Sequence, residues 1–225
     1  MRLHIFQHEA SCAPGTIGDW CAAREVVPLL TRFHLGETLP ALNEVDALLI
    51  LGGAMNAYQD ADFPHLQTVR DFTRAALEGN KKVCGICLGA QIMADALGSR
   101  VVRAPEQERG WIEIVRREEA ASSPLLRWLP QRARFISWHD DTFAVPDGVV
   151  HGAQSDACAA QAFAFGDHAL ALQFHPEAGA SIVAGWIEDE PEAEHDELRA
   201  EFFPFESRFE RQRELLFAAL DAWIS

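Results

Sequence analysis

The first hundred residues alternate between short, mostly apolar runs and longer amphipathic stretches. The apolar runs have the length of buried strands, and they predict strands at 3–6, 47–51 and 82–86. The helical spacing of apolar residues between and after them predicts helices at 20–30, 64–79 and 88–97. Continuous apolar strands separated by helices are typical of a mainly parallel sheet that is covered on both faces.

The pattern changes after residue 98 into short strand-like pieces that are joined by turn residues. Strands are predicted at 100–103, 111–116, 134–138 and 169–174. Helical patterns return at 180–188, in an acidic stretch up to residue 202 and at 206–223, with Pro191 and Pro204 as breaks. The length fits one domain, so we expect a single domain over residues 1–225 that includes the C-terminal helices from about residue 180.

The charge of the chain argues against nucleic acid as a partner. It has 34 acidic and 19 basic residues, a net charge of −15 at pH 7, whereas a nucleic-acid binder must neutralise phosphates. No run of about 18 apolar residues could span a membrane, and the N-terminal stretch lacks the uninterrupted apolar region of a signal peptide. We therefore expect a cytoplasmic protein that binds neither nucleic acid nor membranes.

The cysteines do not form a disulfide pattern. Their number is odd and their spacing irregular, which is typical of a reduced protein. The five are Cys12, Cys21, Cys84, Cys87 and Cys158. One of them is left as a candidate nucleophile.

Cys87 lies where an apolar strand runs directly into a helix, between Gly85 and Gly89. This is the pattern of a nucleophile elbow, in which glycines two positions before and after the nucleophile relieve crowding at a sharp turn. The positive end of the helix dipole favours a thiolate at this place. The backbone N–H of Leu88 is then one donor for an oxyanion.

Two other interpretations of Cys87 are open. A free cysteine is commonly a buried structural residue, although such a residue does not require flanking glycines. The spacing Cys84-x-x-Cys87 also fits a redox pair, but the attacking cysteine of such a pair is expected to be the first, and Cys84 lies inside the apolar strand.

A base for the thiol is predicted at the end of another strand, in the segment His175-Pro176-Glu177. His175 can take the proton from sulfur, and Glu177 can hold the other ring nitrogen. The pair Gly52-Gly53 after a buried strand lets a backbone N–H approach a ligand and offers a second oxyanion donor. Each segment has an alternative interpretation. His175 could be a buried histidine whose ring is hydrogen-bonded within the core, and Gly52-Gly53 could be an ordinary turn at the end of a strand.

Together these segments resemble the class I glutamine amidotransferases, in particular their stand-alone members such as the glutaminase subunits of GMP synthase and the γ-glutamyl peptidases. The resemblance rests on Gly85 to Gln91, His175 to Glu177, Gly52-Gly53, Gln7 to Glu9, Glu108 to Trp111 and Trp138 to Phe143. It implies that Gln91 and the backbone near His139 and Asp140 hold the amino-acid end of the substrate, and that Gly53 and Leu88 bind the oxyanion. Asp140 stands where many relatives have glycine, and Ala54 where proline often follows the glycine pair.

The fold implied is a flavodoxin-like three-layer α/β sandwich with a mostly parallel central sheet and the site at the carboxyl ends of its strands. The expected reaction is hydrolysis of a γ-glutamyl amide through a thioester on Cys87, without a metal or an organic cofactor. A small γ-glutamyl compound is then the substrate. Two alternatives remain: a glutaminase subunit that donates ammonia to a separate synthase, and a non-catalytic binding protein on the same fold.

Overall fold

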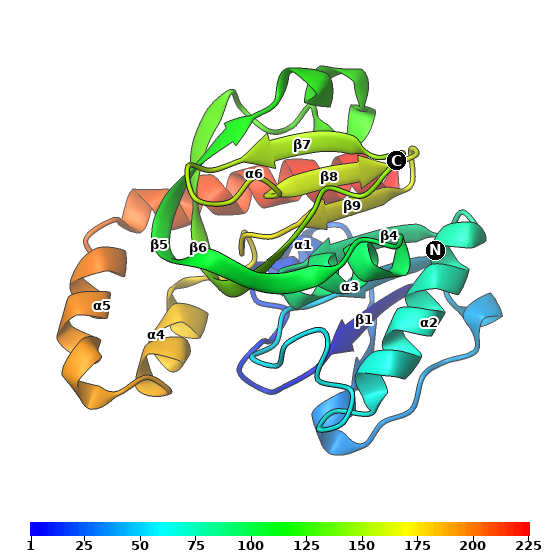
Figure 1. The fold of residues 1–225 in the computed structure, drawn as a ribbon, viewed down its shortest axis with the longest axis horizontal. Coiled ribbons are helices and arrows are strands. Elements are labelled where there is room, and N and C mark those ends of the chain that lie inside the picture. Colours follow the sequence, from blue (N-terminus) through cyan, green and yellow to red (C-terminus); the bar gives the residue numbers. More distant parts are fainter.

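The computed structural model describes residues 1–225, and its strands form one nine-stranded sheet with helices on both faces (Figure 1). The order across the sheet is β2-β1-β3-β4-β9-β8-β7-β5-β6. The strands are β1 (Leu3–Gln7), β2 (Leu29–Arg32), β3 (Ala47–Ile50), β4 (Lys82–Ile86), β5 (Val101–Arg116), β6 (Arg132–Phe143), β7 (Val150–Gln154), β8 (Ala162–Phe165) and β9 (Ala169–Leu172).

The sheet has a parallel half and an antiparallel half. Strands β2, β1, β3, β4 and β9 pair in parallel, in the order that flavodoxin-like folds use. Strands β8, β7, β5 and β6 continue the sheet as antiparallel neighbours. The carboxyl ends of β1, β3, β4 and β9 meet at one edge, so the segments that follow these four strands converge there.

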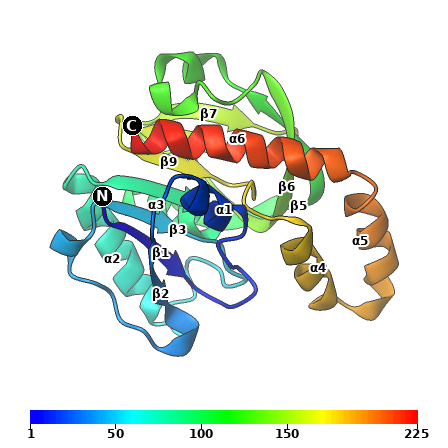
Figure 2. The ribbon, with the colours of Figure 1, turned by 180° about the vertical axis from the view of Figure 1, so that it is seen from behind.

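Helices cover the two faces of the sheet in separate layers. The helices are α1 (Thr16–Ala23), α2 (His65–Glu78), α3 (Leu88–Ala96), α4 (Ala180–Glu188), α5 (His195–Phe202) and α6 (Glu206–Ile224). Alternate strand residues such as Leu3 and Ile5 pack against α1 and α6 (Figure 2), whereas Phe6 and Ile50 pack against α2 and α3 on the other face (Figure 1). This period-two division of apolar residues gives two cores and confirms the predicted three-layer arrangement.

Helices α4 and α5 form an arm beside the sheet, next to β5 and β6 (Figures 1 and 2). The arm has its own small core, in which Trp186 and Phe202 pack with Trp111 and Ile136 of the sheet. Pro191 lies between α4 and α5, and Pro204 lies between α5 and α6, as the sequence predicted. The arm lies at the same end of the sheet as the carboxyl ends of the parallel strands.

The helix predicted over residues 20–30 is wrong in its second half. Helix α1 ends at Ala23, and the chain turns at Glu25, which has a φ of 55°. Pro28 follows, and a proline both ends a helix and extends the residue before it. The apolar residues Leu29 and Leu30 belong to the edge strand β2 instead.

The antiparallel half also differs from the prediction. The pieces at 100–103 and 111–116 are parts of one long strand, β5, whose pairing with β6 shifts register between Arg103 and Glu108. Strands β7 and β8 were not predicted, because histidine and glycine interrupt the apolar pattern of β7 and because β8 has only four residues, two of which are alanine. None of the helices combines the length and apolar character that crossing a membrane requires.

Candidate active site

Cys87 lies at the turn between β4 and α3, in a backbone conformation that side chains rarely adopt. Its φ is 51° and its ψ is −109°, and a residue held in such a region costs about 1–3 kcal/mol. The Cys87 N–H donates to the carbonyl of Leu172 at 2.8 Å, and its own carbonyl accepts from Gln91 at 3.0 Å. The strained turn is thus fixed to β9 on one side and to α3 on the other.

Two glycines make this turn possible because the chain passes so close to itself. A Cβ on Gly85 would lie 2.5 Å from the carbonyl carbon and oxygen of Gly89, and a Cβ on Gly89 would lie 2.1 Å from the carbonyl oxygen of Ile50. Both distances are far below van der Waals contact. The sequence pattern of glycines around Cys87 is therefore explained by close backbone approach.

Replacement of Gly89 by alanine is expected to destabilise the protein by about 1–3 kcal/mol, the usual range for overpacking. The new methyl group must push α3 away from β3, because it meets backbone rather than a flexible side chain. Gly18→Ala in the middle of α1 is the matched control, since a Cβ there meets no atom within 4 Å. Urea unfolding measures the stability of both variants. Equal unfolding midpoints for Gly89→Ala and Gly18→Ala would contradict this account of the turn.

The structure brings His175 and Glu177 to Cys87 from the end of β9. The Nδ1 atom of His175 lies 2.8 Å from Oε1 of Glu177, and both side chains are almost completely buried. A Cβ placed on Gly52 would be 3.0 Å from Cε1 of His175 and 3.5 Å from Cβ of Cys87. The imidazole and the thiol therefore lie together against the Gly52 backbone, and Glu177 lies on the far side of the ring.

The charges around His175 outweigh its burial. Burial acts to lower the pKa of His175, but the neighbouring Cys87 sulfur and the Glu177 carboxylate raise it, to about 10. An imidazole in this environment holds its proton at neutral pH. The arrangement thus has a protonated ring between sulfur and carboxylate.

The other predicted residues lie around the same point. Leu88 begins α3 directly after Cys87, and its side chain lies against Gly53, where a Cβ would be 2.9 Å from its Cδ2 atom. The two residues that carry the predicted oxyanion donors are thus neighbours. The buried Gln91 amide donates to the carbonyl of Asp141 and to Oε1 of Gln173, both at 3.4 Å.

His139 and Asp140 line the site from β6, although neither ring nor carboxylate is free. Asp140 pairs with Arg103 at 3.0 Å and has no positive φ, so the position held by glycine in many relatives needs no special conformation here. The Nδ1 atom of His139 lies 3.1 Å from the carbonyl of Asp141. Its Nε2 atom lies 3.0 Å from a carboxylate oxygen of Glu108.

Glu108, His139 and Cys158 have ligand-type atoms within 4.8 Å of one another, as in a metal site. The Glu108 carboxylate, however, accepts from Ser155 at 2.6 Å and from Gln161 at 2.5 Å. Burial acts to raise the pKa of Glu108, but the donors around it lower it below its usual value. We interpret the cluster as a buried hydrogen-bond network that fixes His139 beneath the site.

Three residues to which the sequence assigned no role also shape the site. The amide of Gln173 donates to Sγ of Cys87 at 3.7 Å. Oε1 of Glu9 accepts from the backbone N–H of Ala54 at 2.6 Å and so fixes the turn that carries Gly53. The indole of Trp186 packs edge-on against the His175 ring, with 4.8 Å between centroids. Only Gln173 had a clear signal, as the single polar residue of the apolar strand predicted over 169–174; it directly follows β9.

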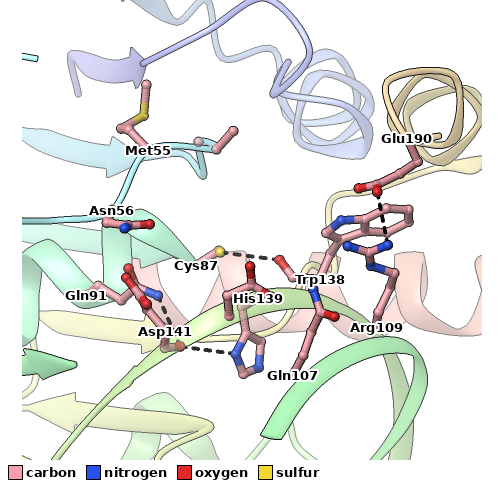
Figure 3. A pocket seen from close by; sticks show the side chains of 13 residues that line it. Met55, Asn56, Cys87, Gln91, Gln107, Arg109, Trp138, His139, Asp141 and Glu190 are labelled. Atoms are coloured by element: carbon pink, nitrogen blue, oxygen red, sulfur yellow. Dashed lines mark hydrogen bonds and ion pairs between the residues drawn. The ribbon is translucent and has the colours of Figure 1, made fainter. Parts of the chain in front are cut away.

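Two cavities meet at Cys87. The first, of about 200 Å³, is here called the polar cavity and is shown in Figure 3; the second, of about 130 Å³, is called the indole cavity. Both are lined by Gly53, Ala54, Cys87, Trp138 and Glu190. The polar cavity adds Met55, Asn56, Gln91, Gln107, Arg109, His139, Asp140 and Asp141, and the indole cavity adds Glu9, Ser11, Cys12, His175, Trp186 and Asp189. The nucleophile thus lies between a polar compartment and an aromatic one.

Comparison with known proteins identifies the family. The family model described as glutamine amidotransferase class-I matches residues 22–183, which is more than half of the chain. The chain belongs to the class I glutamine amidotransferase family. This confirms the resemblance on which the sequence analysis relied.

Its relatives within the class I glutamine amidotransferases have several names. The chain is 28% identical over 192 residues to the glutamine amidotransferase-like protein YfeJ of Salmonella typhimurium, covering 84% of this chain and 80% of that protein. It is 30% identical to γ-glutamyl peptidase 4 of Arabidopsis thaliana, over 63% of this chain and 57% of that one. It is 36% identical to a glutamine-hydrolysing GMP synthase subunit of Methanoculleus marisnigri, over 48% and 58%. The last two are thus covered over less than two thirds of their length.

A solved structure agrees with the whole chain. A glutamine amidotransferase from Methylobacillus flagellatus superimposes with a TM-score of 0.91 at 28% identity, covering 99% of this chain and 94% of that one. The agreement therefore includes most of the C-terminal arm and α6, which lie beyond the end of the family match at residue 183.

Proposed function

We propose that the protein hydrolyses γ-glutamyl amides through a γ-glutamyl thioester on Cys87. The observation that carries this proposal is the convergence of Cys87, His175 and Glu177 at the junction of two cavities. A nucleophile, a proton carrier and a group that orients it are what acyl transfer requires.

In the first half-reaction, Cys87 gives its proton to His175, and the resulting thiolate forms a bond to the γ-carbonyl carbon. The backbone N–H groups of Gly53 and Leu88 stabilise the oxyanion that develops. His175 then passes its proton to the amide nitrogen, the C–N bond breaks and the amine leaves. Glu177 keeps the ring oriented and stabilises its positive charge throughout.

In the second half-reaction, a water molecule replaces the amine. His175, now neutral, takes a proton from water as the hydroxyl oxygen attacks the thioester carbon. The C–S bond breaks, glutamate leaves, and the thiolate and protonated imidazole are restored. The groups that carry protons and stabilise charge in this cycle are all side chains and backbone groups of this chain, and water is the second reactant.

The polar cavity suits the α-amino and α-carboxylate groups of the substrate. It contains Arg109, whose guanidinium lies 4.8 Å from the Trp138 ring and 3.1 Å from Glu190. Figure 3 shows Gln91 and Asp141 on the other side of Cys87. A compartment with both signs of charge fits a zwitterion, in line with the role proposed for Gln91, His139 and Asp140.

The purified protein is expected to release glutamate from at least one γ-glutamyl amide at about one turnover per second or faster, in the ordinary range of enzymes. The reason is that the thiol, the imidazole and the carboxylate are already together in the isolated chain. Steady-state glutamate release measures this, with Cys87→Ala as the blank.

A second candidate is a glutaminase that feeds ammonia to a separate synthase, which the similarity to the GMP synthase subunit of Methanoculleus marisnigri favours. Such a glutaminase often requires its partner to align the oxyanion donors, and one misplaced donor costs about a hundredfold or more in rate. If the pure protein hydrolyses no γ-glutamyl amide at a measurable rate and a purified synthase restores activity, the protein is a glutaminase subunit and not a free-standing hydrolase.

A further inference from the structure

The indole cavity is larger than the leaving group of glutamine requires. Its volume is about 130 Å³, whereas a molecule of the size of water or ammonia needs about 10–15 Å³ on the same measure. His175, the residue proposed to protonate the leaving nitrogen, lines this cavity and not the polar one. A substituent on the γ-nitrogen would therefore extend into the indole cavity.

The walls of this cavity are aromatic and held in place. Trp138 and Trp186 meet at an interplanar angle of 65°, with 5.6 Å between centroids. The Trp186 indole N–H donates to the carbonyl of Ser11 at 3.0 Å. These two rings offer apolar area to an alkyl chain and ring faces to a cation.

Apart from His175, which lies beside the nucleophile, the charged residues that line the cavity are acidic. Glu9, Asp189 and Glu190 line it, and no lysine or arginine does. Glu190 is paired with Arg109, whereas Glu9 and the exposed Asp189 have no basic partner within ion-pair distance, so the entrance has a negative potential. A leaving group that ends in a carboxylate would be repelled there, and one that ends in an ammonium group would be attracted.

We propose that the substrates of this enzyme are γ-glutamyl amides of an alkyl amine that carries a second, protonated amino group. This inference rests on the proposed function and specifies its substrate class. The alkyl chain would lie against the adjoining rings of Trp138 and Trp186, and the ammonium group would face Asp189 and Glu9. The reaction remains hydrolysis, in which the C–N bond breaks and the diamine leaves with the proton from His175.

Four substrates with the same γ-glutamyl group test the inference: glutamine and the amides of 1,4-diaminobutane, n-butylamine and 4-aminobutanoate. The last three have side chains of similar length with positive, neutral and negative ends. The kcat/KM for the diaminobutane amide is expected to exceed those for glutamine and for the aminobutanoate amide by about tenfold each. The butylamide should fall between the two charged amides.

Substitution of Asp189 tests whether charge causes the preference. Asp189→Asn is expected to lower the ratio of kcat/KM for the diaminobutane amide over the butylamide by about threefold, and Asp189→Lys by about tenfold. The matched control is Asp167→Asn, another exposed acid, which lies before β9 at the opposite end of this strand from His175. Its ratio should equal that of the wild type.

The outcomes separate this inference from the proposed function. Glutamate release that is fastest from glutamine or from the aminobutanoate amide overturns the inference and leaves the hydrolase intact. If no amide is hydrolysed, the proposed function fails. Calorimetric measurement of the binding of the four amides to Cys87→Ala then tests whether the indole cavity prefers a positively charged substituent. Tighter binding of the diaminobutane amide than of glutamine supports the inference, and equal or weaker binding overturns it.

Discussion

Replacing Cys87 by alanine is expected to lower kcat/KM for γ-glutamyl amides by about 10⁶-fold, the loss seen when a nucleophile is removed from a catalytic triad. The methyl group keeps the Cβ but leaves no atom that can bond to the γ-carbonyl carbon. Stability should change little, because the side chain is small and donates no strong hydrogen bond. Glutamate release and thermal unfolding are the measurements.

The control for this variant is Cys21→Ala, a buried cysteine in α1 that packs only in the core between α1, α6 and the sheet. This variant should keep the activity of the wild type, because the small cavity that it leaves in the core affects mainly stability. If Cys87→Ala retains more than about one hundredth of the wild-type activity, Cys87 does not attack the substrate.

Glu177→Gln is expected to lower kcat/KM by about 10⁴-fold, less than the loss of Cys87, because the base itself remains. It should also change the pH profile. In the wild type, His175 stays protonated until about pH 10, so activity should hold through neutral pH and fall on the alkaline side. Removing the negative charge of Glu177 removes one cause of the raised pKa, while burial continues to lower it. The alkaline limb therefore moves to lower pH.

The pH profile of kcat/KM for the two proteins tests this assignment, with thermal unfolding as a check that the variant is folded. A merely structural carboxylate would lower activity evenly at all pH values. An alkaline limb that stays in place, or moves to higher pH, would show that Glu177 does not stabilise the charged form of His175.

The sequence predicted the parts of the site that depend on local geometry. The glycines around Cys87 indicate a sharp turn in which the chain passes too close to itself for larger side chains at these positions. The pair His175 and Glu177 is local too, because one proline separates them at the end of a strand. The parallel order of the strands then brings the ends of β4 and β9 side by side.

The sequence did not predict features that depend on distant segments. Glu9 acts on the Ala54 N–H from the end of another strand, and Trp186 reaches His175 from the arm. Neither contact has a signal in the spacing of residues. Strand β2 was missed because an edge strand with exposed leucines resembles the end of an amphipathic helix.

The central claim, a γ-glutamyl thioester on Cys87, is tested most directly by acid quenching during turnover followed by peptide mapping with mass spectrometry. The protein is mixed with excess substrate, quenched within the first turnovers and digested at low pH, where thioesters survive. We expect a single glutamyl group on the peptide that contains Cys87 and none on the peptides of Cys12, Cys21 or Cys158. Rapid glutamate release without any adduct on Cys87, or with adducts spread over several cysteines, would contradict the account.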